Sequence, residues 1–196
     1  MFHKIVIEND VGNNPQVQNI LRKFPQIETL YVDRFDEIWG KAKKPYLHKR
    51  SHLNLFLARK RGKLIKEAPE AYGKKGAPHY YFVHAYNCIY ECKYCYLQGY
   101  FNTPDLVFFV NHDEILREMK KTLDKHKGET EVWFHAGEFS DSLALSHLTG
   151  ELSGYFDFFK NHPQALLELR TKSANTRELL KLKAQENVIT SFSLSP

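Results

Sequence analysis

From Tyr80 onward, short apolar runs alternate with amphipathic segments, and this alternation limits the fold more than any other feature of the sequence. The runs are rich in β-branched and aromatic residues, which favour strands, and the segments between them have helical periodicity. We predict strands at 80–86, 131–136, 165–171 and 188–195, separated by helices at 112–126, 140–160 and 175–185. Such alternation favours an α/β fold of about four parallel strands with helices outside, open or curling toward a barrel.

Residues 1–77 follow a looser pattern. Strands at 4–9 and 27–32 with a helix at 18–24 predict a small N-terminal α/β extension. The following stretch, up to about Pro78, is rich in Lys and Arg and has few apolar runs, so we predict a basic connector with one helix over 50–60. The chain of 196 residues therefore divides into an extension with its connector at 1–77 and a sheet domain at 78–196.

All three cysteines lie within eight positions, as Cys88, Cys92 and Cys95. An odd number disfavours disulfides. The N-terminus has no apolar segment of the kind found in signal peptides. The sequence also contains no run of about 18 apolar residues, which a membrane-spanning helix would need. We therefore expect a cytoplasmic protein with reduced thiols, in which a cluster of cysteines indicates metal or redox chemistry.

The cysteine loop follows a predicted strand, at the edge of the sheet where α/β folds build their sites. Three thiolates can bind three irons of a [4Fe–4S] cluster, which leaves the fourth iron open to a substrate or cofactor. The alternative is a structural zinc site in which His84 adds a fourth ligand. Structural zinc sites usually take ligands from two separated segments, which these four residues do not provide.

The spacing Cys-x3-Cys-x2-Cys, with Tyr94 before the third cysteine, resembles the cluster loop of the radical S-adenosylmethionine superfamily. Six segments occur in an order similar to that in the spore photoproduct lyase family. They are CKYCYLQ (92–98), FVNHDEIL (109–116), FHAGEFSD (134–141), HLTG (147–150), RTK (170–172) and FSLS (192–195). The resemblance covers nearly the whole chain, and the ordered set of motifs strengthens it beyond the cysteine motif alone.

The resemblance implies a partial (β/α) barrel that holds a [4Fe–4S] cluster and S-adenosyl-L-methionine. It implies a lyase that generates a 5′-deoxyadenosyl radical to repair thymine adducts in DNA, with an electron donor such as a flavodoxin or ferredoxin. The net charge of +5 and the pI near 9.0 permit a polyanionic partner. The basic stretches 41–50 and 58–66 are then candidates for phosphate contacts, or simply solvated surfaces.

Within this resemblance, the three cysteines match the cluster ligands. Tyr94 and Tyr96 match tyrosines of the family's radical relay or cofactor contacts, although rings here can also simply pack the loop. Ser140 and Ser193 match serines of the cofactor pocket, and Lys172 matches a lysine that pairs with the cofactor's carboxylate. Without the resemblance, Ser140 would be a helix cap, and Lys172 and Ser193 ordinary residues at strand ends.

Two features depart from the family. Glu138 stands where the family keeps a hydrogen-donating cysteine, and a carboxyl O–H bond is too strong to donate a hydrogen atom to a carbon radical. Ala136, Gly137 and Glu138 instead resemble the superfamily's Gly-Gly-Glu motif, whose carboxylate binds the cofactor's ammonium group. The chain also ends at Pro196, after the fourth strand, as an N-terminal portion or a truncated member would. Two alternatives follow: a radical enzyme with a different substrate, and a non-catalytic module that binds a cluster or nucleic acid.

Overall fold

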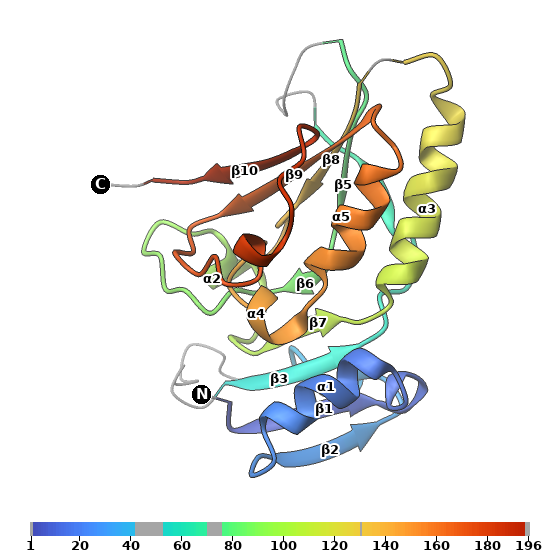
Figure 1. Cartoon of the computed structure of the whole chain (residues 1–196). Helices are drawn as coiled ribbons and strands as arrows, with labels where there is room; N and C mark the ends of the chain where they lie inside the picture. The colour runs from blue at the N-terminus through green and yellow to red at the C-terminus, as the bar shows by residue number, and fades with distance from the viewer. Residues whose placement is uncertain (1, 42–52, 70–75, 130, 195–196) are drawn as a thin grey trace. The chain divides into compact units, whose positions relative to one another are not determined.

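The computed structural model of the chain describes residues 2–41, 53–69, 76–129 and 131–194. They form two compact units (Figure 1). Unit 1 comprises Met1–Lys60 and His84–Val110, and unit 2 comprises Arg61–Val83 and Asn111–Pro196. The units interleave in the sequence, and the division of the chain at residue 77 stays a prediction. None of the helices in the described part is long and apolar enough to cross a membrane.

Unit 1 contains a five-stranded sheet with the order β2-β1-β3-β7-β6. The bounds are β1 Lys4–Glu8, β2 Glu28–Val32, β3 Asn54–Ala58, β6 Ala85–Tyr86 and β7 Leu106–Phe109. β6 pairs antiparallel with β7, and the other pairings are parallel. The predicted strands at 4–9 and 27–32 are confirmed, as is the helix at 18–24, which is α1 (Pro15–Lys23). The described part of unit 1 also has the short helices η1 (Asn9–Val11), η2 (Phe35–Glu37) and α2 (Leu97–Tyr100).

The helix predicted over 50–60 is wrong. Residues 50–52 lie outside the described part, and β3 occupies the centre of the range. Leu55, Phe56, Leu57 and Ala58 are all buried, and β3 pairs in parallel with β1 on one side and β7 on the other. A strand buried on both faces has a continuous apolar run instead of alternation. Such a short run cannot be distinguished from a buried helix by periodicity alone.

Unit 2 contains a second five-stranded sheet, with the order β10-β9-β8-β5-β4. The bounds are β4 Ile65–Glu67, β5 His79–Phe82, β8 Val132–Ala136, β9 Ala165–Thr171 and β10 Val188–Phe192. β5, β8, β9 and β10 are parallel neighbours, which confirms the four predicted parallel strands, and β4 is antiparallel to β5. The strand predicted at 80–86 is divided: β5 belongs to this sheet, and β6 joins the sheet of unit 1.

Of the three helices that the sequence predicts in unit 2, one is confirmed. α3 (His112–Lys125) confirms the helix predicted at 112–126. The continuous helix predicted at 140–160 is wrong, since it is replaced by α4 (Ser146–Thr149) and α5 (Leu152–Lys160). Gly150 ends α4 in the left-handed conformation, with φ of 69°. The helix predicted at 175–185 is also wrong, since only the 3₁₀ turn η5 (Leu179–Lys181) forms there.

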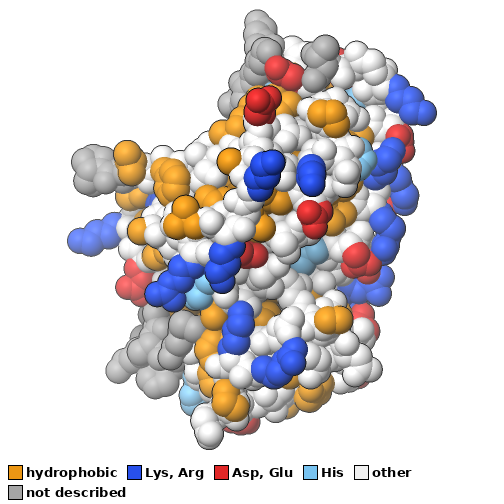
Figure 2. Space-filling view, viewed as in Figure 1, with side chains coloured by type: hydrophobic (Ala, Val, Ile, Leu, Met, Phe, Trp, Pro, Cys, Tyr) orange, Lys and Arg blue, Asp and Glu red, His pale blue; other side chains and the backbone are white. Residues whose placement is uncertain are grey.

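α3 and α5 pack on one face of the unit 2 sheet (Figure 1). Ile115 and Met119 of α3 and Phe159 of α5 are buried there against strand residues such as Phe134 and Leu167. Along β9 every second residue is buried, which is the pattern of a strand with one face on a core. The outer side of α3 carries Lys, Arg, Asp and Glu side chains (Figure 2), which form ion pairs one turn apart.

The same substitution, leucine to alanine, tests this core when it is made at one buried and one exposed position. Leu167 in β9 is fully buried and Leu180 in η5 is 79% exposed. We expect Leu167→Ala to lower the free energy of unfolding by about 2–5 kcal/mol, because it removes burial and leaves a cavity. Leu180→Ala should change it by about 0.5 kcal/mol or less. Denaturant unfolding followed by circular dichroism measures both, and equal losses would contradict the core.

Candidate functional site

The cysteines lie in unit 1, on a turn between β6 and α2. The backbone N–H of Cys95 donates to the carbonyl of Cys92 at 2.9 Å, and the side-chain amide of Gln98 donates to the same carbonyl at 2.7 Å. The backbone N–H of Tyr90 donates to Cys88 Sγ at 3.5 Å. None of the three cysteines forms a disulfide, and all three are half-buried. Backbone contacts thus order the turn without using the sulfur atoms of Cys92 and Cys95.

Asn87 fixes the entry to this turn. It is buried and has a positive φ of 63°, a conformation that Asn tolerates better than most residues. Its side-chain amide donates to the carbonyls of Thr103 and Asp105, each at 2.8 Å, directly before β7. The Asp105 carboxylate accepts from the backbone N–H of Asn54 at 2.8 Å. The start of the cysteine turn is therefore tied to the sheet of unit 1.

The donor set decides which metal group this turn fits. Among the described residues, no three His, Cys, Asp or Glu side chains are arranged to hold a metal ion. His84 and the three cysteines are all described, so the structure gives the zinc alternative no support. In a cluster each thiolate binds a different iron, so the sulfur atoms need not converge on one ion. Three thiols on one turn suit iron–sulfur chemistry, in which the irons take cysteine thiolates as ligands.

Tyr94 and Tyr96 flank Cys95 and are 60% and 58% exposed. Tyr96 contacts Tyr100 edge to face, with 5.8 Å between ring centroids. Packing of the loop therefore does not bury either ring. Their place in a radical relay or cofactor contact stays a prediction.

The two basic stretches give little evidence of a phosphate site. Residues 42–50 lie outside the described part of the chain. In the second stretch, Lys60 Nζ lies 5.9 Å from the ring centroid of Tyr86 and 5.7 Å from that of Phe109, within the range of a cation–π contact. Contact with DNA along these residues stays a prediction.

The other predicted site residues lie in unit 2, each just after a parallel strand. Glu138 and Ser140 are on the turn that follows β8, Lys172 follows β9, and Ser193 follows β10. Lys172 and Ser193 are exposed, and Glu138 and Ser140 are half-buried. The backbone N–H of Ser193 donates to the carbonyl of Thr171 at 2.8 Å. The structure thus places these four residues at the same edge of the sheet.

Gly137 allows the turn after β8 to pass close to β9. Its φ is 88°, and a Cβ at this position would lie 2.7 Å from Ser142 Oγ and 3.0 Å from the carbonyl oxygen of Arg170. Both a positive φ and this close approach require glycine. The Ser142 side chain is buried, and its hydroxyl has no hydrogen-bond partner among the described residues.

Asp141 ties the turn to the end of β9. Its Oδ1 accepts from the backbone N–H groups of Leu143 and Ala144, at 3.0 and 2.9 Å, and from the Thr171 hydroxyl at 2.7 Å. Its Oδ2 accepts from the backbone N–H of Lys172 at 2.7 Å. We expected a long helix to begin at residue 140, and this was wrong because the first helix after β8 begins at Ser146. The acidic residue instead holds two strand ends together, a role that sequence reasoning missed.

The arrangement suits a zwitterionic ligand. Glu138 presents a carboxylate and Lys172 an ammonium group at neighbouring strand ends, with hydroxyl groups nearby. An amino-acid group carries the complementary pair, and hydrogen bonds between charged groups are about twice as strong as neutral ones. The residues present therefore fit the methionyl end of S-adenosylmethionine.

The face of the same sheet that points away from α3 and α5 carries a polar network. Glu168 accepts at Oε2 from His135 Nδ1 at 2.5 Å and from Arg170 Nε at 2.8 Å, and at Oε1 from the Ser191 hydroxyl at 2.8 Å. His135 Nε2 lies 3.0 Å from His79 Nδ1. The structure buries His135 to 1% exposure in this network.

The surroundings of Glu168 set its pKa. Burial acts to raise the pKa of the carboxyl, but hydrogen bonds from His135 and Ser191 and the charge of Arg170 outweigh it, and the pKa falls from 4.5 to about 2. Glu168 is therefore ionised through the ordinary pH range and compensates the charge of Arg170.

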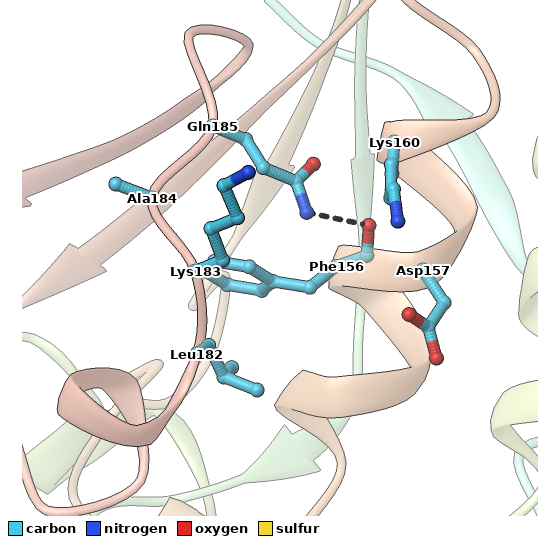
Figure 3. Close-up of a pocket in the computed structure, with 7 residues that line it drawn as sticks. All are labelled: Phe156, Asp157, Lys160, Leu182, Lys183, Ala184 and Gln185. Atoms are coloured by element: carbon cyan, nitrogen blue, oxygen red, sulfur yellow. Dashed lines mark hydrogen bonds between the residues drawn. The ribbon is translucent and has the colours of Figure 1, made fainter.

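A hollow in unit 2 lies apart from the candidate site (Figure 3). It has a volume of about 280 Å³ and lies between α5 and the segment before β10. Gln185 closes one side by donating from its amide nitrogen to the carbonyl of Phe156 at 3.0 Å. The hollow is at the start of β10, whereas the candidate site follows the ends of the strands, so the two are distinct.

Comparisons with known proteins agree with the fold and the motifs. A family model described as spore photoproduct lyase matches residues 65–196. A spore photoproduct lyase of Clostridium acetobutylicum is 24% identical over 200 residues, which cover 100% of this chain and 57% of that protein. A spore photoproduct lyase of Geobacillus sp. is 31% identical over 100 residues, or 50% of this chain and 29% of that protein. The chain thus spans about 57% of the first relative's length.

Solved structures show the same fold. A cysteine-to-serine mutant of spore photoproduct lyase matches with a TM-score of 0.80 at 21% identity, covering 99% of this chain and 56% of that one. A double mutant with bound AdoMet and dinucleoside spore photoproduct matches with a TM-score of 0.81 at 23% identity and the same coverage. This likeness confirms the predicted partial-barrel fold class.

The pKa of Glu168 predicts an acid-sensitive contribution to stability. Because the pKa is lowered in the folded state, the contribution is complete above pH 4.5 and is lost as the pH falls toward about 2. In Glu168→Gln this part of the pH dependence should disappear. Ser191→Ala, which removes one of the hydrogen bonds, should reduce it less. Denaturant unfolding at a series of pH values measures the slopes, and parallel curves for the parent and Glu168→Gln would contradict the assignment.

Proposed function

The chain belongs to the spore photoproduct lyase family, and we propose that it is a radical S-adenosylmethionine lyase that acts on thymine adducts in DNA. The observation that carries the proposal is the cysteine turn, with three half-buried thiols in family spacing, none of them in a disulfide. Support for the substrate comes from a solved relative that holds AdoMet and a dinucleoside spore photoproduct. We also propose that the protein works in the cytoplasm with a flavodoxin or ferredoxin as electron donor, since thiols stay reduced there.

We assign Cys88, Cys92 and Cys95 to a [4Fe–4S] cluster. When bound there, the cluster supplies the electron that cleaves S-adenosylmethionine to a 5′-deoxyadenosyl radical. The turn contributes thiolates and a backbone that is already ordered through the Cys92 carbonyl, so little rearrangement is needed on binding.

The strand ends of unit 2 are assigned to the cofactor's amino-acid group. Lys172 donates to its carboxylate and Glu138 accepts from its ammonium group, while Ser140 and Ser193 add hydroxyl contacts. Asp141 acts as a positioning residue, because its contact with the backbone of Lys172 fixes where that side chain begins.

Tyr94 and Tyr96 are assigned to the radical relay, and Tyr96 also to contact with the cofactor. Glu138 leaves no thiol at the position of the family's hydrogen donor, and the sequence has no cysteine beyond the three on the turn. The exposed hydroxyl of Tyr96 is therefore our candidate for the group that returns a hydrogen atom to the substrate.

The cluster assignment is tested by anaerobic reconstitution. We expect about four irons and four sulfides per chain, and Cys92→Ala should abolish the cluster because two thiolates cannot hold three irons. Lys93→Ala, an exposed neighbour on the same turn, is the control and should retain it. Iron and sulfide analysis with the visible spectrum gives the readout. A colourless protein with one tightly bound zinc would end the radical proposal.

The cofactor assignment is tested by Lys172→Ala. The loss of a charge-assisted hydrogen bond should weaken S-adenosylmethionine binding by about 1.5–3 kcal/mol. Lys181→Ala removes an equally exposed lysine from η5 and should leave the affinity unchanged. Equilibrium binding to the reconstituted protein measures both variants. Equal affinities for the two would remove Lys172 from the site.

A further inference from the structure

The hollow between α5 and the segment before β10 has no part in the assignments above. We propose that it is a binding site for a small organic carboxylate with an apolar body. The hollow lies at the start of β10, whereas the residues assigned to the cofactor follow the ends of the strands. The inference therefore stands independently of the proposed function.

Hydrogen bonds hold the two walls of the hollow together. The amide nitrogen of Gln185 donates to the carbonyl of Phe156, in the middle of α5, at 3.0 Å (Figure 3). The amide nitrogen of Asn187 donates to the carbonyl of Phe159, near the end of the same helix, at 2.8 Å. These two contacts fix residues 182–187 beside α5, so the hollow is formed before any ligand arrives. A pre-formed site reduces the entropy lost on binding.

Phe156 and Leu182 give the hollow an apolar lining. Phe156 is buried, and Leu182 packs against the core of unit 2, so neither side chain is free to move out of the way. The volume of about 280 Å³ is just below the range of about 300–1,000 Å³ that is typical of pockets for drug-sized ligands. The space therefore suits a single ring or a short hydrocarbon body, and it is too small for a nucleotide.

Three charged side chains also line the hollow, namely Lys160, Lys183 and Asp157. Within the described part of the chain, none of the three forms an ion pair or a side-chain hydrogen bond. Figure 3 shows the two ammonium groups on either side of the hydrogen bond between Gln185 and Phe156, and the Asp157 carboxylate points away from them. An ammonium group has three donors and no acceptor, so this pair of lysines favours an anion.

The charges and the apolar lining together select the class of ligand. Two lysines and one aspartate leave a single positive charge in excess, which a carboxylate balances. A phosphate group carries about 1.5–2 negative charges at pH 7, and inorganic phosphate has no apolar part. An exposed ion pair contributes little by itself, so binding also requires that the lining remove apolar surface of the ligand from water. A carboxylate on an apolar body uses both features of the hollow.

Titration of the full chain with benzoate, followed by two-dimensional NMR of the backbone amides, tests the site. Benzoate should shift the signals of α5 and of residues 182–187, with a dissociation constant of about 1 mM or tighter. Three further probes separate the contributions: benzyl alcohol has the ring without the charge, acetate has the charge without the ring, and inorganic phosphate has more charge and no ring. Each should bind about threefold more weakly than benzoate, or weaker still.

A double variant tests the two lysines. Lys160→Gln combined with Lys183→Gln should weaken benzoate binding about fivefold, to the affinity of benzyl alcohol. Both lysines are exposed, so the variant should keep its fold, which circular dichroism checks. Lys125→Gln is the matched control, because Lys125 is an exposed lysine in the last turn of α3, as Lys160 is in the last turn of α5. This control should bind benzoate like the parent.

Four outcomes would overturn the inference. They are benzoate shifts confined to other parts of the chain, unchanged affinity in the double variant, and binding of benzyl alcohol or of phosphate as tight as that of benzoate. Equal binding of benzyl alcohol would show an apolar hollow that does not recognise charge, and equal binding of phosphate would show that charge alone is recognised. The titration requires neither cluster nor cofactor, so its failure and the failure of the proposed function are distinguishable.

Discussion

The candidate cofactor site in unit 2 depends on one carboxylate. Asp141 accepts four hydrogen bonds, two from its own turn and two from the end of β9. A half-buried charge is tolerable only because each oxygen is satisfied. The same contacts fix the distance between the turn after β8 and the backbone of Lys172. Gly137 makes this spacing sterically possible, since any side chain there would meet Ser142 and Arg170. The geometry of the site is thus set by residues that we do not assign to the ligand.

The sequence was informative where local pattern and tertiary environment agree. β9 and α3 were predicted because each has one clear periodicity and one buried face. β3 was mistaken for a helix because its apolar run is buried on both faces and has no alternation. Residues 175–185 carry leucines at helical spacing, and Leu179 and Leu182 pack against the core, yet Leu180 is 79% exposed and only a 3₁₀ turn forms there. Spacing alone does not show whether a face will be covered.

The same limit applies to the site. The cysteine turn and the strand-end residues could be found because each belongs to a short contiguous motif. Asp141 was visible in a motif, but its partners Thr171 and Lys172 are 30 and 31 positions away. The contact of His135 with Glu168 likewise spans 33 positions and depends on the pairing of β8 with β9. Contacts of this kind follow from strand register, which one sequence does not contain.

The pairing register of β9 and the polar network around Glu168 also depend on each other. A slip of β9 by one residue would turn Glu168 and Arg170 toward Phe134 and Phe159, and turn Leu167 outward. A buried ion pair that loses its hydrogen-bond partners costs about 3–5 kcal/mol. In the observed register, Glu168 has partners from β8, β9 and β10 at once. The polar side chains of this network therefore penalise the wrong pairing of the strands.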